Sequence, residues 1–573
     1  MTRILVTRSN TLRSTKKLLT TTINNSLKSN SNRCFSSSST SLIKLLNSTK
    51  NLNKKKGKSM KELNIALASG ILFVASYISL SSHYLSDSGL PSSNGLKSFS
   101  TTQSNNNSNT SNKQNLYLLN DDEITKRLRN LEESYYVNRG KGVIRYDISQ
   151  LPSNNPIEDD RSESVITVPI TSEENADFYF WGIYDGHSGY YTSLKLRDDL
   201  INYVVNELGS IYKPQPENPQ LRIIPTQESI DLAIKQGFLK LDYDIVQKSL
   251  TKLLENPNDK SNAINALPAA SGACGLLTFY DSSSQILKVA VTGDSRALLG
   301  SLNEENEWTV TSLSNDQTGD SKEEIERIQS EHPNEPNVIK NGRVLGSLQP
   351  TRAFGDFRYK LKEIAGKSID SLPEHLRIYF RQPPRNLLTP PYVTAEPEIT
   401  SIKINPSKND FLVIGSDGLY ELLSNEEIVG LVVKWLEKNK INESSPSLNS
   451  KSWKFFTKDD KKLPQIKDLS NPIHKEAQRP AFRNKKTNES HEFLLEDSNV
   501  STHLIRNALS LGGSKDYVST LVSIPSPTSR KYRDDLTVTV VFFGQDGFIK
   551  EDGKLEINLD ATKGGNLNEK PKL

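Results

Sequence analysis

Short runs of apolar, β-branched and aromatic residues recur through the central and C-terminal parts of this chain. Five of them end near glycine or aspartate and occupy residues 178–186, 276–280, 286–293, 411–418 and 536–544. Runs of this length and composition predict β-strands. The stretch 286–300 predicts two strands joined by a turn at Gly293-Asp294.

Between these runs the spacing of apolar residues changes to the period of a helix. One series comprises Leu194, Ile201, Val204, Val205 and Leu208. A second series comprises Ile230, Ile234, Leu241 and Ile245. Both series predict amphipathic helices. Hairpin-like strands separated from long helices favour the α+β class over a parallel nucleotide-binding sheet.

Residues 1–62 have the composition of a targeting segment. They contain fourteen Lys and Arg residues, and the first acidic residue is Glu62. Leucine, isoleucine, serine and threonine are interleaved with the basic residues, as in mitochondrial transit peptides. A disordered basic tail is the alternative interpretation.

Residues 63–82 form an apolar stretch without a charged residue. As a helix rising about 1.5 Å per residue, the stretch matches the hydrocarbon thickness of a bilayer. The basic run 53–61 precedes it, so the positive-inside rule predicts that the N-terminus stays in the matrix and the remainder crosses the inner membrane. A buried helix of a soluble domain is the alternative.

The rest of the chain divides by composition. Residues 83–115 are rich in serine and asparagine and predict a linker. The folded domain is expected over 116–550, with insertions near 360–391 and 437–498, followed by a loose polar tail at 551–573. That tail ends in Pro571, Lys572 and Leu573, which resembles the peroxisomal signal S-K-L and predicts a minor peroxisomal pool.

Charge and cysteine content exclude several classes of function. The whole chain carries a formal charge of +4, but the residues after the N-terminal segment hold 58 basic against 68 acidic residues. No nucleic-acid partner is expected, because phosphate backbones attract clustered positive charge. With Cys34 and Cys274 as its two cysteines, the chain has neither a disulfide scaffold nor an all-cysteine metal site.

Acidic residues next to the predicted strands are the candidate catalytic groups. They are Glu158-Asp159, Asp185, Asp417 and Asp534-Asp535. Carboxylates that converge from several strand ends repel one another unless cations bridge them, and such oxygen ligands suit Mg or Mn. Two of these ions could activate a water and neutralise a phosphoryl group. His187 lies two residues after Asp185 and is a candidate proton donor to a leaving alkoxide.

Eight motifs occur in an order that resembles the metal-dependent serine/threonine phosphatases of type 2C. They are PIED, YDGHSG, SGACGLL, VAVTGDSRALL, TRAFGDF, VTAEPEI, LVIGSDGLYELLS and RDDLTVTVV, and the resemblance spans residues 142–544. It implies two antiparallel β-sheets packed as a sandwich and flanked by α-helices. It also implies a hydrolase of phosphoserine and phosphothreonine in proteins.

The resemblance assigns roles residue by residue. It implies that Asp159 and Asp185 bridge two Mg or Mn ions, and that Gly186 contributes its backbone carbonyl. Asp417 and Asp534 complete this binuclear site. Asp294 would hold a third, weaker ion, and His187 would be the general acid.

One position departs from the pattern of many family members. Asn154 stands where they have a phosphate-binding arginine. Within the family the chain resembles the mitochondrial pyruvate dehydrogenase phosphatase branch, which shares this asparagine. The pyruvate dehydrogenase complex is therefore the expected substrate, in the matrix, whereas residues 63–82 predict the intermembrane space. A different substrate there, an inactive regulatory relative and a hydrolase of small phosphate esters remain alternatives.

Overall fold

The computed structural model describes residues 118–170, 174–218, 222–439, 462–478, 492–545 and 553–563. The predicted segments 1–62, 63–82 and 83–115 lie outside these residues, as do the last three residues of the chain. Across the described ranges, no helix combines the length and the apolar character that a membrane span requires.

The larger sheet has eight strands in the described residues, in the order β14-β8-β7-β13-β15-β2-β1-β16. Its strands are β1 (Glu133–Tyr136), β2 (Val143–Leu151), β7 (Arg296–Leu302), β8 (Trp308–Ser312), β13 (Phe411–Gly415), β14 (Lys467–Asp468), β15 (Leu536–Phe543) and β16 (Glu556–Ile557). Neighbouring strands are antiparallel except for the short pair β14 and β8.

The smaller sheet follows the order β12-β6-β5-β4-β3, with β11 paired to β5. Its strands are β3 (Asp160–Pro169), β4 (Asn175–His187), β5 (Gly272–Asp281), β6 (Ile286–Thr292), β11 (Phe354–Gly355) and β12 (Glu398–Lys403). All of these pairs are antiparallel.

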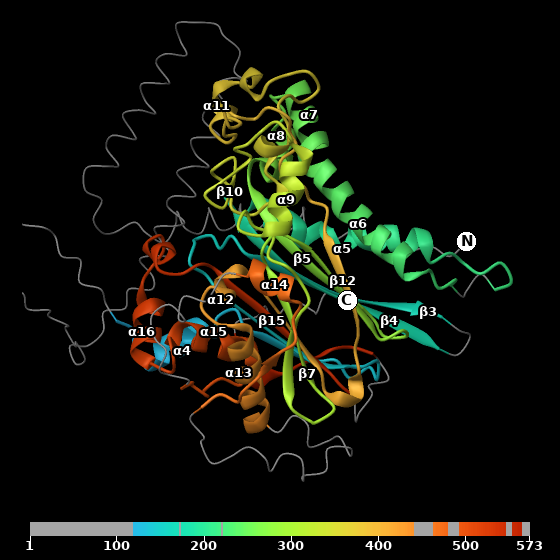
Figure 1. The fold of residues 1–573 in the computed structure, drawn as a ribbon, viewed down its shortest axis with the longest axis vertical. Coiled ribbons are helices and arrows are strands. Elements are labelled where there is room, and N and C mark those ends of the chain that lie inside the picture. The colour runs from blue at the N-terminus through green and yellow to red at the C-terminus, as the bar shows by residue number, and fades with distance from the viewer. Residues whose placement is uncertain are drawn as a thin grey trace, which may run out of the picture. The chain divides into compact units, whose positions relative to one another are not determined.

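Helices cover the outer face of each sheet (Figure 1). The smaller sheet is covered by α5 (Tyr191–Ile211), α6 (Gln227–Tyr243), α7 (Ser249–Glu255) and α8 (Lys260–Ala270). The larger sheet is covered by α4 (Asp121–Leu128), α12 (Asp417–Tyr420), α13 (Asn425–Asn439), α15 (Val500–Ser510) and α16 (Lys515–Ser523). The remaining α-helices of the described residues are α9 (Lys322–Glu331), α10 (Phe357–Lys360), α11 (Glu374–Arg377) and α14 (Pro472–Ala477).

The alternation of side chains along the strands explains this layered packing. In β4, Phe178 and Phe180 pack against the helices, whereas Tyr179 and Trp181 pack between the two sheets. A strand with both faces buried is apolar throughout, because successive side chains point to opposite faces. The predicted sandwich of antiparallel sheets flanked by helices is confirmed.

The predicted turn at Gly293-Asp294 is not a hairpin. β6 and β7 form as expected, but β6 pairs with β5 and β12, and β7 pairs with β8 and β13. The chain therefore passes from one sheet to the other at this turn, where Gly293 has a φ of +113°. Local pattern cannot distinguish the two arrangements, because strand pairing depends on partners that are distant in the sequence.

The two predicted insertions contribute to the folded domain. Residues 360–391 form short helical turns, and their buried side chains join the core beside the smaller sheet; these are Ile364, Ile369, Leu372, Leu376 and Phe380. Within 437–498, β14 adds a strand to the edge of the larger sheet.

The folded domain also extends past the predicted end at residue 550. β16 pairs with β1, and Ala561 is fully buried. Two paired residues in a polar segment are too short a pattern to predict from sequence.

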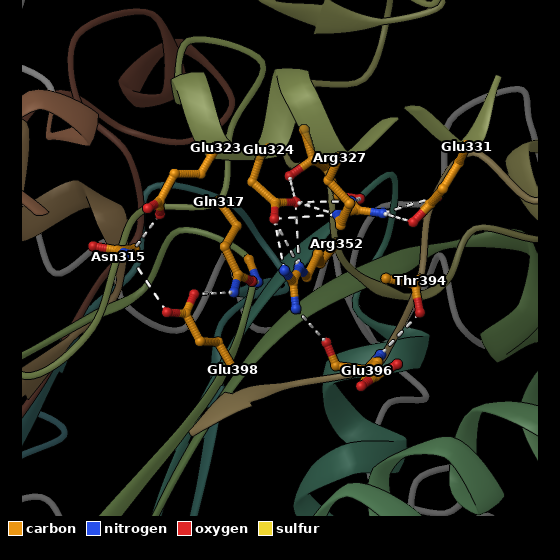
Figure 2. A network of polar contacts seen from close by, with 12 residues as sticks. Asn315, Gln317, Glu323, Glu324, Arg327, Glu331, Arg352, Thr394, Glu396 and Glu398 are labelled. Carbon is orange, nitrogen blue, oxygen red and sulfur yellow. Dashed lines mark hydrogen bonds and ion pairs between the residues drawn. The ribbon is translucent and has the colours of Figure 1, made fainter. Parts of the chain in front are cut away.

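A network of polar contacts holds the segment that contains α9 against the smaller sheet (Figure 2). Glu324 accepts hydrogen bonds from Arg327 Nη2 at 2.7 Å and from Arg352 Nη2 at 2.6 Å. Thr351 Oγ1 donates to the same carboxylate at 2.6 Å. Arg352 also donates to the backbone carbonyl of Glu396, which lies two residues before β12.

We expect Glu324→Gln to destabilise the fold in a pH-dependent way. Although burial opposes the shift, the two guanidinium groups lower the pKa of Glu324 from 4.5 to about 2. A lowered folded-state pKa stabilises the fold above the unfolded pKa, and this contribution is lost as the pH falls from 4.5 to 2. The difference in unfolding free energy from wild type should be about 3 kcal/mol at pH 7 and should shrink below pH 4.5.

Urea unfolding at several pH values measures this difference. Glu331→Gln is the matched control, because Glu331 contacts the same Arg327 at 3.2 Å from a side chain that is 47% exposed. That exposed ion pair should contribute less than about 1 kcal/mol to the free energy of unfolding. A Glu324→Gln effect that stays constant between pH 7 and pH 3 would contradict the assignment.

Candidate metal centre and active site

Acidic side chains from both sheets meet at one edge of the sandwich. Asp185 lies in β4, Asp294 lies in the crossover between β6 and β7, and Asp417 begins α12 directly after β13. One carboxylate oxygen from each lies within 4.8 Å of the other two. The structure therefore brings three of the sequence-predicted residues into a group that could hold a metal ion.

Asp159 and Asp534 are neighbours of this group. Asp159 precedes β3, is buried, and accepts a hydrogen bond from Thr537 Oγ1 at 2.7 Å. Burial and the carboxylates of neighbouring aspartates raise the pKa of Asp159 well above its usual range, and Asp534 is one of these neighbours. Burial, and then Asp417, Asp159 and Asp534, raise the pKa of Asp185 in the same way.

The structure distinguishes Asp534 from its neighbour Asp535. The Asp535 carboxylate accepts hydrogen bonds from the backbone N–H groups of Ser153, Asn154 and Glu158, at 2.5 to 3.0 Å. It also accepts one from Asn154 Nδ2 at 3.1 Å. Asp535 thus organises the loop before β3, whereas Asp534 lines the cavity described below.

Glu158 and Asp159 differ in a similar way. Glu158 accepts hydrogen bonds from the backbone N–H of Gly189 at 2.6 Å and from Asn154 Nδ2 at 3.2 Å. Its backbone carbonyl lies so close to Gly186 that a Cβ there would approach it to 2.3 Å. Glu158 therefore fixes the position of the loop around Gly186, while Asp159 faces the other aspartates.

A cavity of about 540 Å³ lies over the acidic group. Five acidic residues line it, Asp185, Asp294, Asp417, Glu421 and Asp534, together with Gly186 and His187. Basic residues also line it, namely Arg343, Arg530, Lys531 and Arg533. The cavity thus combines acidic and basic groups, as a site for divalent cations and a phosphoryl group requires.

The acidic group fits divalent cations. Among the described residues, the buried Oδ1 atom of Asp417 has no hydrogen-bond partner. Burial and the carboxylates of Asp534 and Asp294 raise the pKa of Asp417 well above its usual range. Carboxylate oxygens are the ligands that Mg and Mn prefer, and a bound cation would offset the repulsion between these carboxylates.

His187 lies at the end of β4 and pairs with Asp356. Its Nε2 atom lies 2.6 Å from Asp356 Oδ2. Burial lowers the pKa of His187, but the Asp356 carboxylate outweighs this effect and the pKa is raised from its ordinary value. A Cβ at Gly272 would come within 2.3 Å of both His187 Nε2 and Asp356 Oδ2. Glycine at this position therefore leaves the space that the His187–Asp356 contact occupies.

Asp356 was missed as a functional residue by the sequence analysis. It lies in the TRAFGDF motif and has a φ of +50°, directly after Gly355 at +70°. A non-glycine residue in this left-handed conformation is uncommon and often marks a functional position. The motif itself was the available signal, but its contact with His187 joins residues 169 positions apart.

Comparison with known families decides the identity of the chain. The model of the protein phosphatase 2C family matches residues 151–458. The chain belongs to the protein phosphatase 2C family. It is therefore a protein serine/threonine phosphatase, as its motifs predicted, and members of this family depend in general on Mg or Mn.

Relatives in the protein phosphatase 2C family extend over most of the chain. The mitochondrial [pyruvate dehydrogenase [acetyl-transferring]]-phosphatase 1 of Saccharomyces cerevisiae is 51% identical over 531 residues, covering 88% of this chain and 89% of the relative. A protein phosphatase 2C homolog of Schizosaccharomyces pombe is 40% identical, covering 74% and 85% respectively. The Homo sapiens [pyruvate dehydrogenase [acetyl-transferring]]-phosphatase 1, mitochondrial, is 31% identical, covering 70% and 78%.

Proposed function

We propose that this phosphatase uses two Mg or Mn ions held by Asp159, Asp185, Asp417, Asp534 and the backbone carbonyl of Gly186. Asp294 would hold a third, weaker ion. The observation that carries the proposal is the meeting of the Asp185, Asp294 and Asp417 carboxylates within 4.8 Å of one another. When bound, the ions activate a water and neutralise charge on the phosphoryl group.

The protein residues have separate tasks in this proposal. Asp356 holds the imidazole of His187 through Nε2 and favours its protonated form. His187 then donates a proton to the serine or threonine alkoxide as it leaves, a step that general acids accelerate about 10²- to 10⁴-fold. The strands and the α12 terminus hold the carboxylates in place, so the site is largely formed before substrate arrives.

We propose the pyruvate dehydrogenase complex as the substrate. Support comes from the names of the yeast and human relatives, which describe phosphatases of pyruvate dehydrogenase. The purified enzyme with Mn²⁺ should release phosphate from phosphorylated pyruvate dehydrogenase faster than from an unrelated phosphoprotein, and chelation of the metal should stop both reactions. Equal rates on the two phosphoproteins would contradict the substrate proposal while leaving the phosphatase assignment intact.

We propose a mitochondrial location, which the N-terminal composition and the names of these relatives support. A segment at 63–82 that crosses the inner membrane would place the catalytic domain in the intermembrane space, away from a matrix substrate. The second candidate function is therefore a phosphatase of an intermembrane-space protein. Protease treatment of mitochondria with a ruptured outer membrane decides, because digestion of the catalytic domain there excludes the matrix.

We also propose a minor peroxisomal pool, directed by Pro571, Lys572 and Leu573. The last ten residues fused to a fluorescent reporter test whether the signal is sufficient, and deletion of Leu573 tests whether it is necessary. A diffuse reporter together with an unchanged distribution of the deletion variant would contradict this proposal.

A further inference from the structure

A cationic side chain in the cavity would help the metal ions to hold a phosphoryl group beside the carboxylates. Asn154 does not supply one, because its side chain is a neutral amide; it donates to Glu158 and Asp535, and the residue does not line the cavity. The basic residues that do line the cavity are Arg343, Arg530, Lys531 and Arg533. The hydrogen bonds and ion pairs that each side chain makes distinguish these four residues.

Two of these residues already donate to other groups of the protein. Arg343 donates to the Ser347 carbonyl at 3.2 Å and to Gln349 Oε1 at 3.1 Å. The buried Arg533 donates to the Pro152 carbonyl at 2.7 Å. Both Nη groups of Arg343 and the guanidinium of Arg533 thus already donate to groups of the protein, so each has fewer donors left for a ligand than a guanidinium with a single partner.

Arg530 is placed differently. It lies in the 3₁₀ turn η6 (Thr528–Lys531), and the neighbouring Ser529 Oγ donates to the Ser153 carbonyl at 2.6 Å. This bond fastens the turn to the loop that carries Asn154. The turn that carries Arg530 is therefore fixed to the loop that carries Asn154, and Arg530 lines the cavity.

The contacts of Arg530 leave room for a ligand. Its Nη1 lies 2.5 Å from Asp534 Oδ2, and its side chain is 48% exposed. Within the described residues its direct ion pair is with Asp534, and the carboxylates of Asp417 and Asp535 attract it from farther away. The other guanidinium N–H groups can donate in parallel to two phosphate oxygens, which the single ammonium of Lys531 cannot do in the same planar geometry.

We propose that Arg530 binds the phosphoryl group of the substrate and the phosphate product, next to the Asp534 carboxylate. This inference rests on the proposed metal site, because Asp534 must face a cation for a phosphate dianion to approach it. Arg530 then has two roles in the cavity: its Nη1 orients Asp534, and its remaining donors orient the phosphoryl group.

Calorimetric titration of inorganic phosphate into the Mn²⁺-loaded full-length enzyme tests the proposal. Arg530→Ala should raise the phosphate Kd about ten- to hundredfold at saturating Mn²⁺, since two charge-assisted hydrogen bonds are lost. Arg197→Ala is the matched control: Arg197 also pairs with a carboxylate, its side chain is 39% exposed, and it does not line the cavity. Its phosphate Kd should stay within about twofold of wild type.

A separate titration with Mn²⁺ alone distinguishes phosphate binding from an effect on Asp534. If Arg530 acts only by orienting Asp534, Arg530→Ala weakens Mn²⁺ binding and regains wild-type phosphate binding once Mn²⁺ is saturating, which overturns the proposal. An equal loss in Lys531→Ala also overturns it, because general charge would then explain the binding. Wild-type enzyme that binds phosphate but hydrolyses no phosphoprotein refutes the proposed function and not this inference.

Discussion

Asp185→Asn is expected to abolish turnover while leaving the fold intact. Asp185 faces the carboxylates of Asp294 and Asp417 within 4.8 Å, so its loss removes a shared ligand of the proposed metal site. The rate should fall more than about 10³-fold, beyond the effect of losing a single transition-state hydrogen-bond donor. Steady-state kinetics on a phosphoserine peptide at saturating Mn²⁺ measures the loss.

The same variant should be at least as stable as wild type without metal. Burial and neighbouring carboxylates raise the pKa of Asp185, so its ionised form destabilises the metal-free fold at neutral pH. Thermal unfolding in chelator should show an equal or higher midpoint for Asp185→Asn. Asp198→Asn, an exposed acid on α5, is the control and should retain activity. Full activity of chelator-treated wild type would refute the binuclear mechanism.

His187→Ala is expected to slow hydrolysis of a phosphoserine peptide about 10²- to 10⁴-fold. An alkoxide leaving group needs a proton, and His187 lines the cavity with its ring held by Asp356. The loss on an aryl phosphate should be less than about tenfold, because a phenolate leaves without a proton. The ratio of kcat values on the two substrates is the measurement.

Two variants sharpen this test. Asp356→Asn removes the carboxylate that holds Nε2 and should show the same preference for the aryl phosphate, with a smaller loss. His375→Ala changes an exposed histidine in α11 and should alter neither rate. Equal losses on both substrates in His187→Ala would show that the histidine is structural.

Sequence patterns predicted much of the fold because several strands are apolar along nearly their whole length. β4, β13 and β15 are buried on both faces, so their composition alone marks them as central strands. Short edge elements such as β14 and β16 escaped prediction, because a two-residue strand is defined by its partner and not by its own residues.

The sequence by itself determined the strands, the long helices, the family and the residue types of the site, since these depend on local spacing and on motifs. The tertiary structure decided which residues meet. β6 and β7 pair in different sheets, and the crossover between them places Asp294 beside Asp185. The tertiary structure also separated Asp534 from Asp535 and brought Asp356 to His187. Contacts between distant residues depend on how the sheets pack, and no local pattern encodes that packing.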